Sequence, residues 1–197
     1  MTALSFIPAA VIMMTSFTRI VVVMAILRQA FGLQQTPSNQ VIIGITLFMT
    51  LFIMTPVYNQ VNETAIEPYL AEKMTTVEAI DKAKVPIRAF MLAQTRVKDL
   101  DTLAGMAGIE AVDQPTDLPM TVIIPSFIIS ELKTAFQIGF MIYVPFLIID
   151  MVVASILMSM GMMMVPPVIV SLPFKLAFFV VADGWSLISG ALVRSYF

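Results

Sequence analysis

Apolar residues fall into runs that are long enough to cross a bilayer, and one polar block separates them. A first run, residues 3–27, leads through a polar connector, residues 29–40, into a second run, residues 41–57. Residues 125–185 are apolar enough to cross about twice, because one span needs about 20 apolar residues at about 1.5 Å each. This pattern predicts an all-α protein built from membrane-associated helical hairpins.

The polar block shows the spacing and the end signals of helices. Thr75 and Glu78 fit a capping box, in which each residue satisfies a backbone N–H of the other. Pro86 predicts a break or a new first turn in the helix that follows. Gly105 and Gly108 predict the end of the helical pattern.

The polar block, residues 58–120, also differs from the rest of the chain in charge. It holds ten acidic and six basic residues, a net charge of −4, whereas the remainder carries +2. This acidity favours the extracytoplasmic side of a membrane. We therefore predict three segments: a first helical hairpin over 1–57, a small inserted helical domain over 58–120, and a kinked C-terminal hairpin over 121–197.

The C-terminal hairpin contains prolines that predict its bends. A long apolar run over residues 138–164 should be bent or hinged at Pro145. Pro166 and Pro167 should end this helix, because neither residue has a backbone N–H to donate. The run that begins at Met1 has no basic segment of the kind that opens a signal peptide, so we expect that upstream sequence is missing.

Composition excludes most catalytic and metal-binding classes. The chain is 59% hydrophobic and 12% charged, which is outside the range of soluble domains. It has no Cys and no His, so thiolate and imidazole metal sites and histidine bases are absent. The net charge of −2 does not suit a nucleic-acid binder. We expect neither an enzyme nor a cofactor.

Charged residues inside the apolar runs are the first candidate functional residues. A charge in a membrane is costly unless it is paired or hydrated. Arg19 lies inside the first run and should face protein or a wet cavity. The C-terminal region holds five more, which we interpret as ion pairs that set assembly geometry: Glu131, Lys133, Asp150, Lys175 and Asp183.

The pairing and purpose of these charges allow more than one hypothesis. Our preferred pair is Glu131 with Lys175, meeting across a subunit boundary. The alternative function is a proton-coupled transporter or ion channel in which Asp150 and Asp183 titrate. A third possibility is a scaffold that only supports assembly.

Methionine is concentrated near the C-terminal turn. Three consecutive methionines, Met162, Met163 and Met164, stand just before the two prolines. Three adjacent residues cannot all face one core from a helix. At a turn they would form a soft apolar patch, because methionine side chains are flexible. Repeated around a ring, this patch could seal a pore.

Long motifs across most of the chain outside the polar block resemble the FliP family. They are Met14-Thr-Ser-Phe-Thr-Arg-Ile20, Leu27-Arg-Gln-Ala30, Pro37-x-Asn-Gln40, Ser130-Glu-Leu-Lys-Thr-Ala-Phe-Gln-Ile-Gly139, Asp150-Met-Val-Val-Ala-Ser155, Met160-Gly-Met-Met-Met-Val-Pro-Pro167, Ser171-Leu-Pro-Phe-Lys175 and Asp183-Gly-Trp185.

The resemblance implies a subunit of the export gate of flagellar type III secretion. It implies five copies of the chain with FliR-like and FliQ-like subunits, around a pore for unfolded flagellar export substrates. It implies contact with lipid of the bacterial inner membrane, within the flagellar basal body, and a periplasmic domain. The family's methionine-rich pore gasket corresponds to Met162, Met163 and Met164.

Overall fold

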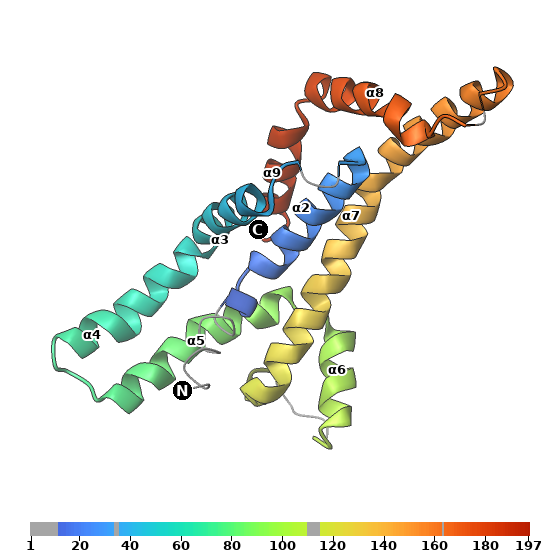
Figure 1. Cartoon of the computed structure of the whole chain (residues 1–197). Coiled ribbons are helices and arrows are strands. Elements are labelled where there is room, and N and C mark those ends of the chain that lie inside the picture. Colours follow the sequence, from blue (N-terminus) through green and yellow to red (C-terminus); the bar gives the residue numbers. More distant parts are fainter. Residues whose placement is uncertain (1–11, 34–35, 110–114, 163) are drawn as a thin grey trace, which may run out of the picture. The chain divides into compact units, whose positions relative to one another are not determined.

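The computed structural model describes residues 12–33, 36–109, 115–162 and 164–197, and these ranges contain helices and no strand (Figure 1). The predicted all-α fold class is therefore confirmed. The elements in chain order are α2 (Phe17–Phe31), α3 (Asn39–Val61), the π-helix η1 (Asn62–Ile66), α4 (Glu67–Leu70), α5 (Thr76–Gln94), α6 (Val97–Met106), the 3-10 turn η2 (Pro115–Asp117), α7 (Met120–Ser159), α8 (Pro167–Val181) and α9 (Gly184–Arg194).

Two of these helical stretches are long and apolar enough to cross a membrane, judged by length and composition over the described residues. One covers Asn39–Leu70, 32 residues, and the other is α7, 40 residues. A third candidate is the pair α8 and α9, which is bent by 63°. The second hairpin helix is thus longer than the predicted run of residues 41–57, because α3 continues through η1 into α4 without a loop.

Prolines interrupt the helices less than the sequence suggests. Helix α5 continues through Pro86, and α7 is unbroken at Pro125 and at Pro145. The predicted break at Pro86 is therefore wrong, and α7 remains one helix through Pro145, where we predicted a bend or hinge. One proline removes one backbone donor, and the remaining hydrogen bonds of each helix keep it intact. Helix α7 ends before Pro166, and Pro167 is the first residue of α8, where a missing N–H costs nothing.

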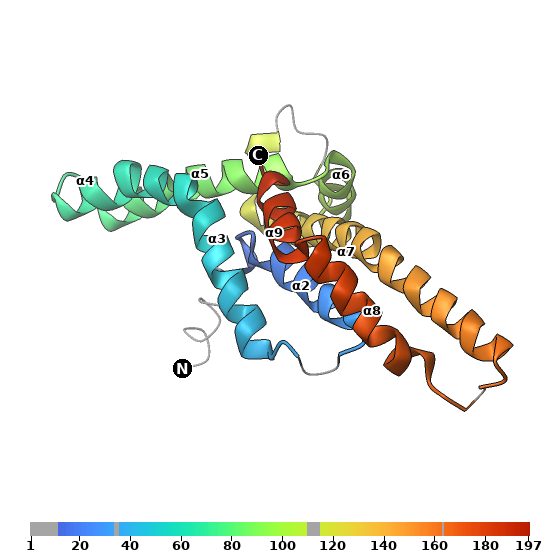
Figure 2. The same cartoon turned by 90° about the horizontal axis from the view of Figure 1, so that it is seen from above.

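The chain divides into two compact units, and α2, α3 and α7 each contribute residues to both. Unit 1 comprises residues 1–19 and 48–134, and unit 2 comprises residues 20–47 and 135–197. The acidic block therefore lies in unit 1 together with parts of the segments that flank it. Helix α5 runs back along η1 and α4 in this unit, as both views show (Figures 1 and 2).

The core of unit 1 lies where α5, α6 and the beginning of α7 meet. Its buried members are Met91, Leu100, Leu118, Ile123 and Phe127. The rings of Phe90 and Phe127 lie 6.0 Å apart between their centroids. The N-terminus of α5 carries the predicted capping box at Thr75 and Glu78.

The core of unit 2 is built on one face of α2 and on a group of aromatic rings. Ile20, Val23 and Leu27 are 0–1% exposed and recur at helical spacing. The Phe31 ring packs edge-on against Phe146 of α7 at 5.1 Å and against Phe179 of α8 at 4.8 Å. Such edge-to-face pairs hold these three helices together.

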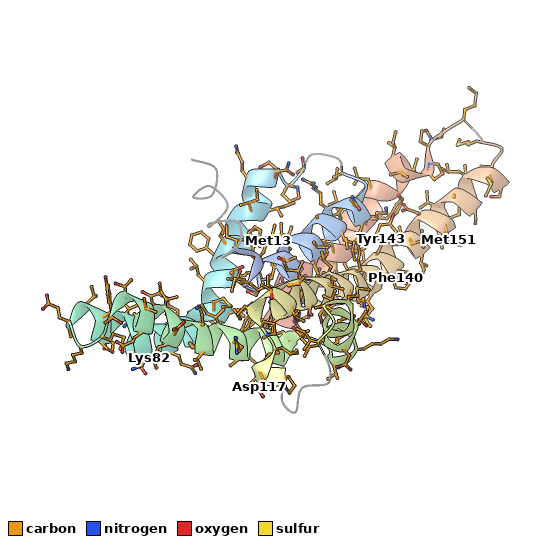
Figure 3. The ribbon with its side chains drawn as sticks, turned by 90° about the horizontal axis from the view of Figure 1, so that it is seen from below. Met13, Lys82, Asp117, Phe140, Tyr143 and Met151 are labelled. Atoms are coloured by element: carbon orange, nitrogen blue, oxygen red, sulfur yellow. The ribbon has the colours of Figure 1, made fainter. Side chains whose placement is uncertain are left out.

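Much of the apolar surface is uncovered by the chain itself. On α7, Phe140 and Met151 are exposed by 67% and 62% (Figure 3). Lys82 on α5 and Asp117 in η2, also labelled there, are exposed charged residues of the acidic block. Large exposed apolar patches mark contact with lipid or with other protein.

Candidate functional site

The buried charge of the first hairpin, Arg19, lies in unit 1 against Glu131. Arg19 of α2 donates from Nε to Glu131 Oε2 of α7 at 3.0 Å, and its Nη2 donates to Glu131 Oε1. The Nη2 group also donates to Gln94 Oε1 at the end of α5, at 3.2 Å. Arg19 is 2% exposed and Glu131 is fully buried. The two-point contact satisfies both charges inside the protein.

A second set of hydrogen bonds attaches the turn between α5 and α6 to α7. Ser130 Oγ accepts from the backbone N–H of Arg96 at 3.1 Å and donates to the carbonyl of Gln94 at 3.3 Å. Arg96 Nη2 donates to Thr134 Oγ1 at 3.2 Å. One face of α7 thus takes the place of the backbone partners that the turn lacks.

Lys133 also pairs within unit 1. Its Nζ donates to Asp99 Oδ1 in the first turn of α6. The Lys133 side chain is 51% exposed, whereas that of Asp99 is 5% exposed. Asp99 was not among the predicted residues. Its position three residues after Arg96 marks it as a first-turn acid of α6, where the helix dipole favours negative charge.

The corresponding buried cluster of unit 2 centres on Lys175 of α8. Lys175 is 2% exposed, and its Nζ donates to Asp150 Oδ2 of α7 at 2.6 Å and to the carbonyl of Ala30 at 3.0 Å. Ser171 Oγ donates to Asp150 Oδ1 at 2.5 Å. Ala30 lies in the last turn of α2, where carbonyls lack helical partners and a cation is favourable. One ammonium group therefore joins α2, α7 and α8.

The pairs within the chain are not the preferred pair that the sequence suggested. Glu131 has Arg19 as its partner and Lys175 has Asp150, each within its own unit. A contact between Glu131 and Lys175 across a subunit boundary stays a prediction. Arg19 already neutralises Glu131, and Asp150 already neutralises Lys175, because a buried charge without an opposite charge nearby is too costly.

Asp183 has a different structural position from the other charged residues. It is exposed, adopts φ +48° and ψ +49°, and joins the end of α8 to the beginning of α9. It forms no ion pair with any residue that the structure describes. Asp and Asn are among the side chains that tolerate this left-handed conformation.

The methionine segment lies between the end of α7 and the beginning of α8. Met162 is 46% exposed and Met164 is 97% exposed. Met163 lies outside the described residues. In the described ranges no group of three or more carboxylates could hold a metal ion.

Comparison with known proteins gives one consistent result. The model of the FliP family matches residues 1–192. A relative from Pectobacterium carotovorum subsp. carotovorum is 51% identical over 197 residues, which are the whole of this chain and 76% of the relative. A relative from Bacillus subtilis (strain 168) is 51% identical over 196 residues and is covered over 89% of its length.

A third relative, from Buchnera aphidicola subsp. Acyrthosiphon pisum, is 51% identical over 196 residues, and the chain spans 52% of its length. All three relatives bear the name flagellar biosynthetic protein FliP. The family model and these relatives match over almost the whole chain, so the resemblance seen in the motifs is confirmed. The chain belongs to the FliP family.

Proposed function

We propose that the chain is a subunit of the protein-export gate of the flagellar type III secretion apparatus. It forms part of the wall of the pore, and Met162, Met163 and Met164 form a gasket that closes the pore around unfolded substrates. The names of its relatives support a role in building the flagellum. The observation that carries the gasket is the exposure of Met164, 97%, at a turn between two apolar helices.

An exposed methionine at a turn suits a gasket for a physical reason. Its unbranched, polarizable side chain adapts to many shapes of neighbouring surface. Exposure of such a side chain to water is unfavourable, because burying apolar area lowers the free energy by about 25 cal/mol per Å². Apposed copies of the segment would bury one another and would yield to a passing polypeptide.

The partners we propose are other copies of the chain, five in all, with FliR-like and FliQ-like subunits and unfolded flagellar export substrates. Uncovered apolar side chains on several helices support contacts of this kind, and they include Phe48 and Phe52 on α3 and Val180 and Val181 on α8. The proposed location is the bacterial inner membrane within the flagellar basal body, with residues 58–120 on the periplasmic side.

The ion pairs serve this function by setting the geometry of the helices, and the chain carries out no chemistry. Asp150 accepts from Lys175 and from Ser171, which leaves it engaged on both oxygens. Asp183 is an exposed turn residue. A proton-coupled transporter requires these two carboxyls to titrate, and it predicts that Asp183→Asn abolishes flux. We expect Asp183→Asn to export normally, because asparagine keeps the left-handed turn.

The test of the gasket is the leak of small ions across the inner membrane of cells that carry Met162, Met163 and Met164 all changed to Ala. Assembly of the complex is checked in parallel. We expect the assembled variant to leak while the wild type stays tight. A matched control changes three exposed methionines of α7 outside the segment, Met141, Met151 and Met158, to Ala. A tight, fully assembled segment variant would contradict the gasket.

A further inference from the structure

Helix α7 ends in a hydrogen-bonded motif that immediately precedes the methionine segment. Gly161 adopts φ +75°. Its N–H donates to the carbonyl of Met158 at 3.1 Å, and the N–H of Met162 donates to the carbonyl of Leu157 at 2.9 Å. These two bonds around a left-handed residue are the Schellman motif, which satisfies the last carbonyls of a helix and stops it.

Glycine at position 161 is required by conformation and not by space. A Cβ added to Gly161 would meet nothing within 4 Å. At Gly139 of α7, by contrast, an added Cβ would lie 2.4 Å from Ile26 Cδ1. Residues other than glycine disfavour the left-handed region on the order of tenfold, and asparagine is the main exception.

The other end of the segment is also constrained. Pro166 holds φ −64° in extended backbone, and Pro167 opens α8. Lys175 and Ser171 of α8 both bind Asp150 of α7, so the two helices are tied together behind the turn. The methionine segment is therefore flanked on each side by a residue with constrained backbone, Gly161 before it and Pro166 after it.

We propose that Gly161 is the positioning residue of the methionine seal. Its left-handed conformation ends α7 directly before the segment and places Met162 and Met164 outside the helix. If α7 continued through residues 162–164, successive side chains would turn by about 100° and could not face one direction together. This inference rests on the proposed gasket and names the backbone feature that presents it.

A series at one position tests this proposal in the assembled complex within cells. The variants are Gly161→Ala, Gly161→Asn and Gly161→Val, with all methionines retained. We expect ion leak to rise in the order Gly, Asn, Ala, Val, with the Ala variant approaching the leak of the triple methionine variant. Asparagine is bulkier than alanine but tolerates the left-handed region. A conformational role therefore puts Asn below Ala, whereas a role for side-chain bulk puts Asn above Ala.

Gly108 is a matched control in unit 1. It ends α6 with φ +69° and the same pair of bonds, from Gly108 N–H to Gly105 O at 3.1 Å and from Ile109 N–H to Ala104 O at 3.1 Å. An added Cβ there also meets nothing within 4 Å. We expect Gly108→Ala to stay tight, because it strains an equal motif far along the chain from the methionines.

The outcomes separate this inference from the proposed function. A tight triple methionine variant removes the gasket itself. A leaking triple variant with a tight, assembled Gly161→Ala variant overturns only the role of Gly161, and so does an Asn variant that leaks more than Ala. If Gly161→Ala fails to assemble, Gly161→Asn is compared with Gly161→Ser. A tight Asn variant beside a leaking Ser variant supports the proposal, and equal leaks overturn it.

Discussion

At the scale of single residues, the buried charged side chains in the part of the chain that the structure describes lie in ion pairs. Arg19 and Glu131 in unit 1, and Lys175 and Asp150 in unit 2, lie within hydrogen-bond distance of each other. A buried pair adds little net stability over apolar residues, but losing one member leaves a charge without compensation. Each pair therefore acts as a constraint on which helix faces can meet.

Glu131→Ala should destabilise the subunit by about 3–5 kcal/mol, because Arg19 then stays buried without its carboxylate. The measurement is the urea midpoint of the purified complex, with the amount of assembled complex in cells as a second measure. Exchanging the two charges, Arg19→Glu with Glu131→Arg, should recover part of the loss.

The control for this prediction exchanges Glu131 and Lys175 instead. Glu131→Lys would place a cation against Arg19, and Lys175→Glu would place an anion against Asp150. We expect this exchange to restore nothing. Recovery by it, without recovery by the Arg19 exchange, would show that the contact across a subunit boundary dominates.

The sequence showed which charged residues interrupt the apolar runs, but it did not show their partners or which of them are buried. Arg19, Glu131, Asp150 and Lys175 stand out because each interrupts an apolar run. Arg19 and Glu131 are 112 positions apart, so their contact depends on how α2 packs on α7 in unit 1. Asp99 gave no signal of this kind, because it is one of many acids in the polar block.

At the scale of helices, local sequence signals predicted the ends of helices better than they predicted breaks within them. The capping box of α5 forms as predicted, with the Thr75 N–H donating to Glu78 Oε2 at 2.8 Å. This bond, with a further one from the Thr75 hydroxyl, holds the pKa of Glu78 below its ordinary value of 4.5. The cap depends only on residues within one turn, so tertiary structure does not alter it.

The capping box should therefore be sensitive to acid. Because the pKa of Glu78 is lowered by folding, its contribution to stability is complete above about pH 4.5 and is lost as the pH falls through the lowered pKa. We expect protection of the Thr75 amide against hydrogen exchange, corrected for the intrinsic rate, to fall in this window. Glu78→Gln, which can still accept the bond, should remove the pH dependence; an unchanged dependence would contradict the assignment.

Close approach of α2 and α7 in unit 2 gives a prediction about packing. Gly139→Val would press against Ile26, where an added Cβ already lies 2.4 Å from Cδ1. Overpacking of this kind costs about 1–3 kcal/mol. We expect a lowered thermal midpoint of the purified complex and partial recovery when Ile26→Ala is added. No recovery in the double variant would show that backbone, and not the Ile26 side chain, limits the site.

At the scale of the whole molecule, the alternation of apolar helices and an acidic block predicts which segments face which side of a membrane. The chain has no Cys, so single cysteines can be introduced without background. Lys82→Cys, on the exposed face of α5, should react with a membrane-impermeant maleimide at the outer face of the inner membrane in cells with a permeable outer membrane.

The control for this measurement is Ser38→Cys, at the exposed residue just before α3. Because the stretch Asn39–Leu70 is long enough to cross, this position should lie on the opposite side and react only after the inner membrane is opened. Labelling of both cysteines in closed spheroplasts would contradict the proposed topology.

By itself the sequence determined the helical class, the membrane character, the acidic block, the α5 cap and the family, because these depend on composition and on neighbours within a few residues. Only the tertiary structure decided which charges pair, whether α7 continues past Pro145, and how Gly161 and Asp183 turn the chain. These features depend on contacts between helices far apart in the chain and on backbone conformation. A proline is compatible with a continuous or an interrupted helix, and a glycine is compatible with several backbone conformations. The rest of the structure decides which of these forms.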